Sequence, residues 1–121
     1  METAVGVSNI SVVYLYVRSM ERSLTFYRDL LGIPLEGGEH WTETAFAGGT
    51  RFALHAAPEG MGEFSSGTVS VSLEVEDVDR ATEGLREHGV EVGETMREDW
   101  GTAADVVDPD GYTITLFQRP G

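Results

Sequence analysis

The sequence predicts an α+β fold built from two copies of one unit, a strand followed by a helix and three strands. Two helix signals carry this prediction, Ser19 to Gly32 and Asp77 to Gly89, and they begin about 58 positions apart (77 − 19). An alternating strand pattern precedes each helix, and short strands follow it. A unit of about 55 to 60 residues buries its sheet poorly by itself. We therefore expect both units to pair into one domain over residues 1–121.

The first unit is predicted at about residues 8–56. Val12 to Val17, within a strand over Ile10 to Val17, alternates β-branched and aromatic residues and is apolar on both faces. Ser19 is a helix N-cap, and Gly32 follows Leu31 as a C-terminal stop, so a helix is expected over Ser19 to Leu31. Glycine pairs then separate three expected strands, Ile33 to Glu36, Trp41 to Ala47 and Arg51 to Ala56.

A linker is expected over residues 57–67, and the second unit at about residues 68–119. The second unit begins with an alternating strand over Val69 to Glu76, and Asp77 caps its helix. A strand is expected over Val90 to Val92. A hairpin closes the unit around Asp108-Pro109-Asp110-Gly111, whose residue types suit a type I turn.

Composition excludes several classes of function. Acidic residues outnumber basic ones 21 to 8, giving a formal charge of −13, which disfavours nucleic acid and anionic membranes as partners. The charge is compatible with cationic small molecules, although the solubility of an acidic surface explains it better. The chain has no cysteine, so it has neither a disulfide framework nor a thiolate ligand. It shows no signal peptide pattern and no apolar run of membrane-spanning length, so a cytoplasmic location is expected.

Four stretches carry a resemblance to a known family: Val17 to Gly32, Val71 to Asp79, Trp100-Gly101 and the turn at Asp108 to Gly111. Their order and spacing resemble the vicinal oxygen chelate superfamily, which includes glyoxalase, extradiol dioxygenases, fosfomycin-resistance enzymes and bleomycin-resistance proteins. The resemblance implies paired βαβββ modules whose mixed sheet curls around a cleft, with the helices outside. It also implies a homodimer, which light scattering can measure. An apolar first strand and open sheet edges favour the same assembly.

The resemblance places the metal ligands of the enzymatic members at four strand positions. In this sequence they fall on Val12, Ala53 (or His55 in another register), Ser70 and Thr115. Divalent metals prefer imidazole and carboxylate ligands, which Val12, Ala53, Ser70 and Thr115 do not offer. We therefore expect no metal and no cofactor. Of the three histidines, His88 suits a helix C-terminus and His40 a hairpin tip, whereas His55 is either a cleft residue or a surface residue.

Residues on the same strand faces as these positions are expected to line the cleft with aromatic rings, hydroxyl groups and carboxylates. The candidate ligand-binding residues are Val12, Tyr14, Tyr16, Trp41, Phe46, His55, Ser70, Ser72, Glu74, Trp100, Thr113, Thr115 and Phe117. Arg51 and Ala53 share the face of His55. Core packing explains Phe46 and Phe117 better than ligand contact, whereas ligand contact is favoured for Trp100. Trp41 and Trp100 are expected on strands that flank the cleft.

The sequence thus predicts a metal-free binding protein of the bleomycin-resistance type that sequesters a flat or cationic organic molecule, such as an antibiotic. No catalytic residue is assigned. One alternative is a metal-independent lyase, isomerase or hydrolase that uses His55, Glu74 and tyrosine hydroxyls. Another is a regulatory or scaffolding module. Turnover in the presence of EDTA would favour the enzyme, and a packed cleft would favour the scaffolding module.

Overall fold

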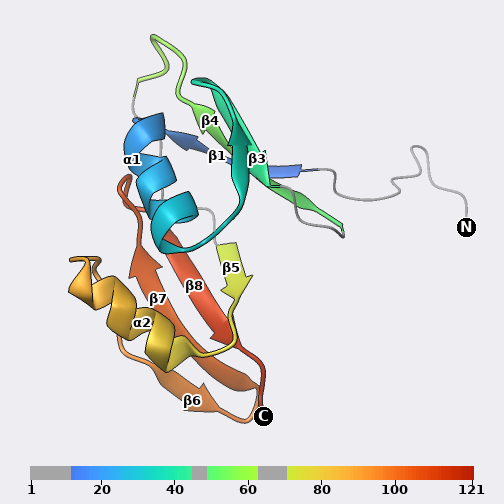
Figure 1. Cartoon of the computed structure of the whole chain (residues 1–121), viewed down its shortest axis with the longest axis vertical. Coiled ribbons are helices and arrows are strands. Elements are labelled where there is room, and N and C mark those ends of the chain that lie inside the picture. The colour runs from blue at the N-terminus through green and yellow to red at the C-terminus, as the bar shows by residue number, and fades with distance from the viewer. Residues whose placement is uncertain (1–11, 45–48, 63–70) are drawn as a thin grey trace, which may run out of the picture. The chain divides into compact units, whose positions relative to one another are not determined.

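A computed structural model describes residues 12–44, 49–62 and 71–121 of the chain (Figure 1). The chain divides into two compact units, Met1–Glu59 and Gly60–Gly121, and each is described by itself. The prediction that the two units form one domain stays a prediction.

The first unit is a four-stranded mixed sheet with one helical segment. Its strands lie in the order β1-β4-β3-β2, with β1 parallel to β4 and the other neighbours antiparallel. Along the chain its elements are β1 (Val12–Val17), α1 (Met20–Leu24), the π-helical segment η1 (Thr25–Leu30), β2 (Leu35–Gly37), β3 (Trp41–Thr44) and β4 (Arg51–Ala56).

The second unit repeats this plan. Its strands lie in the order β5-β8-β7-β6, again with one parallel pair, β5 and β8. Its elements are β5 (Val71–Glu74), α2 (Val78–Glu87), β6 (Met96–Glu98), β7 (Gly101–Val107) and β8 (Thr113–Gln118). The predicted α+β class, with two strand–helix–three-strand units, is confirmed.

Both helices begin where the capping residues predict. The Ser19 hydroxyl accepts a hydrogen bond from the Arg22 amide at 3.2 Å, and the Asp77 carboxylate accepts one from the Arg80 amide at 3.1 Å. Each bond satisfies an amide that the first helical turn leaves without a backbone partner. Gly32 and Gly89 follow the helices with φ of 80° and 77°, the left-handed conformation in which helices commonly end.

The first helix differs from a regular α-helix in its second half. From Thr25 onward it is π-helical, and the Leu31 amide donates to the Phe26 carbonyl at 2.9 Å. The wider turn accompanies burial of two consecutive aromatic side chains, Phe26 and Tyr27. The Ile33 amide donates to the Tyr27 carbonyl at 3.0 Å. Because that donor serves the helix end, β2 begins at Leu35 and not at Ile33 as predicted.

Two predictions in the second unit are wrong. Residues 90–92 form no strand: the Val90 amide donates to the Leu85 carbonyl of α2, and only Val92 makes an isolated bridge, to Val106. Trp100 lies in the turn of the β6–β7 hairpin, not on a strand, because Glu98 pairs with Gly101. The strand β6 was not predicted. The predicted strands over residues 10–17, 41–47 and 69–76 extend partly outside the described residues.

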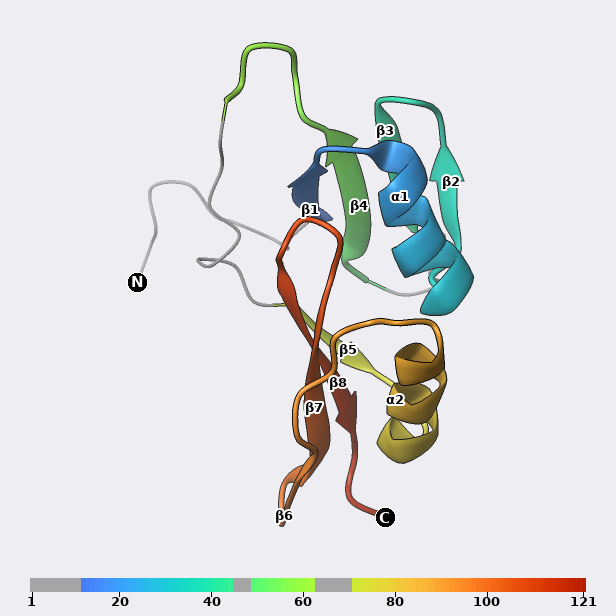
Figure 2. The same cartoon turned by 90° about the vertical axis from the view of Figure 1, so that its left-hand side faces the viewer.

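In the first unit, α1 and η1 cover one face of the sheet (Figures 1 and 2). Four side chains of this face on β1 and β4 are buried: Leu15, Val17, Phe52 and Leu54. The Tyr27 ring lies 5.5 Å from the Phe52 ring, centroid to centroid, and the Thr42 hydroxyl lies 3.6 Å from the Met20 sulfur. Burial of each such apolar side chain stabilises the fold by roughly 1.5–3 kcal/mol.

In the second unit, α2 packs on one face of its own sheet. Buried residues from the helix and the strands form this core: Val78, Leu85, Ala104, Val106, Ile114 and Leu116. The Gln118 side-chain oxygen of β8 accepts a hydrogen bond from the Val78 amide at 2.8 Å, which satisfies another amide of the first turn of α2. This bond fixes the start of the helix against the end of β8.

The predicted turn between β7 and β8 is present. The Gly111 amide donates to the Asp108 carbonyl at 3.1 Å, and Gly111 has φ of 91°. The buried Asp108 carboxylate accepts hydrogen bonds from the amides of Asp110 at 2.9 Å and Tyr112 at 2.8 Å. These bonds from the Asp108 side chain support the predicted turn, which holds the two longest strands of the unit in register.

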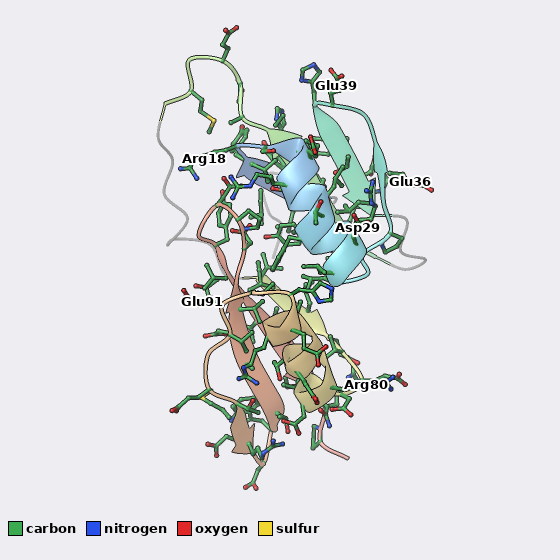
Figure 3. All side chains as sticks on the ribbon, turned by 60° about the vertical axis from the view of Figure 1, so that its left-hand side comes forward. Arg18, Asp29, Glu36, Glu39, Arg80 and Glu91 are labelled. Atoms are coloured by element: carbon green, nitrogen blue, oxygen red, sulfur yellow. The ribbon has the colours of Figure 1, made fainter. Side chains whose placement is uncertain are left out.

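Charged side chains cover the outside of both units. Arg18, Asp29, Glu36, Glu39, Arg80 and Glu91 are exposed, and Figure 3 shows them pointing away from the ribbon. No helix among the described residues is long and apolar enough to cross a membrane.

Two glycines of the second unit should respond oppositely to alanine. A Cβ on Gly101 would lie 2.4 Å from the Gln118 carbonyl oxygen and 2.8 Å from the Phe117 ring, at φ of 140°. Gly101→Ala should lower the free energy of unfolding by about 1–3 kcal/mol or more. Gly84, inside α2, has no atom within 4 Å of the new methyl. Gly84→Ala should raise the same free energy by about 0.5–1 kcal/mol.

Urea unfolding of the two variants beside the parent chain measures both effects. Equal stability of Gly101→Ala and the parent would contradict the close approach of the Phe117 ring to Gly101.

Candidate functional site

The first sheet has a helix-free face, which is the face opposite α1 and η1. Strand register places Tyr14 opposite Ala53 and Tyr16 opposite His55 on β1 and β4, and Trp41 of β3 opposite His55. The residues of this face on the three strands are Val12, Tyr14, Tyr16, Trp41, Glu43, Arg51, Ala53 and His55. The sequence prediction grouped all of these except Glu43, which the alternation of Trp41, Thr42 and Glu43 could have identified.

Four rings on this face form an aromatic cluster, which consists of Tyr14, Tyr16, Trp41 and His55. The His55 ring lies 5.1 Å from Tyr16, 5.7 Å from Trp41 and 5.8 Å from Tyr14, measured between centroids. Tyr14 lies 5.6 Å from Tyr16 and 5.4 Å from Trp41, in edge-to-face arrangements. These separations are typical of favourable aromatic pairs. His55 contacts each of the other three rings and is therefore the hub of the cluster.

The aromatic cluster is accessible. The Tyr14 side chain is 42% exposed, and Tyr16, Trp41 and His55 are half-buried. A hydrogen bond with Tyr14, followed by repulsion between the two phenolates and by desolvation, raises the pKa of Tyr16 above its ordinary value. The Tyr16 hydroxyl is therefore neutral at physiological pH and acts as a hydrogen-bonding group within the cluster of rings.

An ion pair lies at one side of the aromatic cluster. The Arg51 guanidinium contacts the Glu43 carboxylate at 3.1 Å, and both groups are partly exposed. Glu43 is the register partner of Ala53, which is fully buried among its neighbours. Glu36 of β2, the register partner of Glu43, adds a second carboxylate to this face, so the pair offsets only part of its negative charge.

The second sheet also has a helix-free face, opposite α2. Register places Ser72 opposite Thr115, and Thr115 opposite Asp105. The Thr115 hydroxyl donates a hydrogen bond to the Asp105 carboxylate at 2.7 Å. Glu74 lies opposite Phe117 on this face, and its carboxylate accepts a hydrogen bond from Arg119 at 2.9 Å. Thr113 is exposed at the start of the same strand, β8.

Trp100 stacks on Phe117 on this second sheet. The ring centroids lie 6.2 Å apart, with 23° between the ring planes. Trp100 is 50% exposed and Phe117 is half-buried. The exposure places Trp100 outside the core, and a role in ligand contact stays a prediction. Gly101 permits the close approach of the Phe117 ring, which no other residue type at position 101 would allow.

The positions that the resemblance assigns to metal ligands do not fit a divalent ion. Val12 offers only hydrocarbon, Ala53 is fully buried, and the Thr115 hydroxyl is engaged by Asp105. Ser70 lies outside the described residues. Across residues 12–44, 49–62 and 71–121, no group of three or more histidine or acidic side chains could hold a metal.

The remaining candidates are exposed elsewhere in the first unit, belong to the second unit or are not described. Phe46 and Ser70 fall outside the described residues. His40 is exposed between β2 and β3, and His88 is exposed at the C-cap of α2, where its Nδ1 lies 3.0 Å from the Gly84 carbonyl. Glu74, which the enzymatic alternative paired with His55, belongs to the second unit.

A family model for the Glyoxalase/Bleomycin resistance protein/Dioxygenase superfamily matches residues 9–116, which is most of the chain. The chain belongs to this superfamily. The resemblance to this superfamily that the sequence showed is confirmed. No curated protein matches the sequence.

Solved structures similar to this chain include proteins of different kinds. TnmS3, an antibiotic binding protein from Streptomyces sp. CB03234, is 28% identical; 98% of this chain and 100% of that chain are covered, with a TM-score of 0.74. A glyoxalase/bleomycin resistance protein from Streptomyces sp. CB03234 is 30% identical over 92% of this chain and 100% of that chain, with a TM-score of 0.70. Lactoylglutathione lyase from Agrobacterium tumefaciens shares the fold at 16% identity, with 93% and 94% coverage and a TM-score of 0.69.

The tyrosine pair predicts a specific titration. Tyr14→Phe removes the hydroxyl that raises the pKa of Tyr16, so that pKa should fall towards its ordinary value of about 10. Because the native pKa is raised, neutral Tyr16 contributes to stability below the ordinary pKa, and this contribution is lost as the pH rises through the native pKa. Side-chain carbon NMR of the tyrosines measures this change in pKa. The pH is varied from about 8 to about 12, the range in which phenols ionise. Trp41→Phe keeps both hydroxyls and should leave the pKa of Tyr16 raised.

Proposed function

We propose that this protein binds and sequesters a planar organic molecule, of the kind represented by antibiotics, on the aromatic cluster of the first sheet. The observation that carries the proposal is the accessible cluster of four rings on the sheet face opposite α1 and η1, which no helix among the described residues of this unit covers. Large apolar side chains are usually buried, and an accessible aromatic surface with a few polar groups is characteristic of a binding site for organic ligands.

Family membership and the relatives support this proposal. A protein 28% identical over nearly the whole chain is named as an antibiotic binding protein. The hydroxyls of Tyr14 and Tyr16 are hydrogen-bonding groups within the aromatic cluster, and the Arg51–Glu43 pair forms a polar border. Binding without turnover agrees with the absence of metal-ligand residue types at Val12, Ala53 and Thr115. A homodimer and a cytoplasmic location stay predictions.

The two tryptophans make a direct test possible, because each unit contains one. Proflavine, a planar cation, is titrated against single-tryptophan variants. In the Trp100→Phe variant, Trp41 is the remaining tryptophan. Proflavine should quench its fluorescence in a saturable manner. Trp41→Ala should weaken binding by roughly threefold to tenfold, since an aromatic contact is worth about 0.5–1.5 kcal/mol beyond its buried area. Trp100→Ala measures in the same series whether Trp100 also contacts the ligand.

Val13→Ala is the matched control. Val13 lies on β1 between Val12 and Tyr14 and is 38% exposed, but it points to the helix side of the sheet. Its replacement should leave the affinity unchanged. If Trp41→Ala binds proflavine like the parent chain, with both melting normally, the aromatic cluster is not the site. Chemical change of a bound compound in the presence of EDTA would instead support the metal-independent enzyme.

Metal independence is a separate prediction. The purified protein should contain no stoichiometric zinc, iron, nickel or manganese by elemental analysis. Its melting temperature should be the same with and without EDTA, because bound metal would otherwise add to stability. Stoichiometric metal together with a lower melting temperature in EDTA would contradict this part of the proposal.

A further inference from the structure

His55 is the hub of the aromatic cluster, and one of its ring nitrogens is already engaged. Nδ1 lies 2.7 Å from the Ala56 carbonyl oxygen. A carbonyl oxygen can only accept a hydrogen bond, so Nδ1 must carry the proton in this contact. In the neutral ring Nε2 is then unprotonated and is an acceptor.

The surroundings of Nε2 leave this acceptor available. Nε2 lies at the distal edge of the ring, away from Cβ, and among the described residues it makes no hydrogen bond. The rings of Tyr14, Tyr16 and Trp41 surround the imidazole at 5.1–5.8 Å between centroids. A nitrogen lone pair among rings, with water partly excluded, gains more from a hydrogen-bond donor than it would in bulk water.

The backbone keeps the proton of the neutral imidazole on Nδ1. The Ala56 carbonyl that fixes Nδ1 belongs to the end of β4, whose register with β1 pairs Ala56 with Val17. Val17 is fully buried, and the Ala56 amide donates to the His40 carbonyl at 2.9 Å. The carbonyl is therefore part of a fixed strand end, so the tautomer is selected before any ligand arrives.

We propose that His55 Nε2 is the hydrogen-bond acceptor of this site, and that the ligand is a flat aromatic molecule carrying a hydroxyl or ring N–H donor at its edge. The inference rests on the proposed function and narrows its ligand class. The rings supply contact area for the flat body, and Nε2 selects for the donor. A flat molecule without a donor would leave Nε2 desolvated and unpaired, which weakens its binding.

A matched pair of probes separates the donor from the ring. 2-Naphthol carries one hydroxyl donor, and 2-methoxynaphthalene has the same rings without it. The parent protein should bind 2-naphthol about threefold to tenfold more tightly in calorimetric titrations, the range expected for one neutral hydrogen bond. The titrations are run at about pH 8, where an ordinary imidazole is neutral.

Two substitutions at position 55 test the acceptor. His55→Phe keeps an aromatic ring but removes the nitrogen, so the preference for 2-naphthol should vanish while 2-methoxynaphthalene still binds. His55→Gln restores an acceptor oxygen and should recover part of the preference. Melting curves establish that each variant folds. An unchanged preference in His55→Phe overturns the inference.

Nitrogen NMR of the parent protein gives an independent readout that needs no variant. The ring shifts of His55 should show a proton on Nδ1 and none on Nε2, and Nε2 should shift with 2-naphthol but not with 2-methoxynaphthalene. A proton on Nε2 in the free protein overturns the inference. Equal binding of both probes overturns it while leaving the proposed function intact. Failure of both probes and of proflavine to bind overturns the inference and the proposed function together.

Discussion

The register between the parallel strands β1 and β4 is the constraint on which the first unit depends. It places Leu15 opposite Leu54, and both side chains are almost fully buried beneath the helix. A shift of one residue would exchange the two faces of β1 and turn its tyrosines towards Tyr27 and Phe52. Burial of each apolar side chain is worth roughly 1.5–3 kcal/mol, whereas an aromatic pair adds about 0.5–1.5 kcal/mol. The core therefore decides the register, and the aromatic cluster follows from it.

The second unit obtains its register from a turn. The Asp108 carboxylate is buried and accepts hydrogen bonds from two backbone amides, which offset the loss of water around its charge. That turn aligns Asp105 with Thr115 and the small Ala103 with Phe117. The Phe117 ring then has room over Ala103 and Gly101, and Trp100 stacks on its exposed side. A turn at one end of the hairpin thus positions an aromatic pair at the other end.

Much of the fold could be predicted from local patterns. Alternation identified β1 and β5, glycine pairs delimited β4, capping residues identified both helices, and turn chemistry identified the β7–β8 hairpin. The strand β6 could not be predicted this way. Its residues, Met96 to Glu98, are all exposed and owe their conformation to pairing with β7. The π-helical turns depend on how Phe26 and Tyr27 pack against the sheet, which propensity does not encode.

The candidate site, like the fold, could be predicted from the sequence only in part. Tyr14, Tyr16, Trp41 and His55 could be grouped because strand period and order place them on one face. Predicting the Arg51–Glu43 pair requires the register of β3 against β4. Predicting the tautomer of His55 requires the orientation of its ring, which the sequence does not give. The sequence predicts Trp100 on a strand that flanks the cleft. Only the pairing of Glu98 with Gly101 shows that it lies at a hairpin tip.

The aromatic cluster is organised before a ligand binds, and this has a consequence for selectivity. Each ring is held by two or three edge-to-face or tilted contacts, so little side-chain freedom remains to be lost when a flat molecule is bound. Arg51 offsets the charge of Glu43, and Glu36 leaves this face negative, as the chain is as a whole with a formal charge of −13. The overall charge acts on approaching cations over about 8–10 Å at physiological salt, and it is screened beyond that distance. Charge therefore affects how often a cation reaches the protein, whereas ring geometry and hydrogen bonding decide which flat molecule stays.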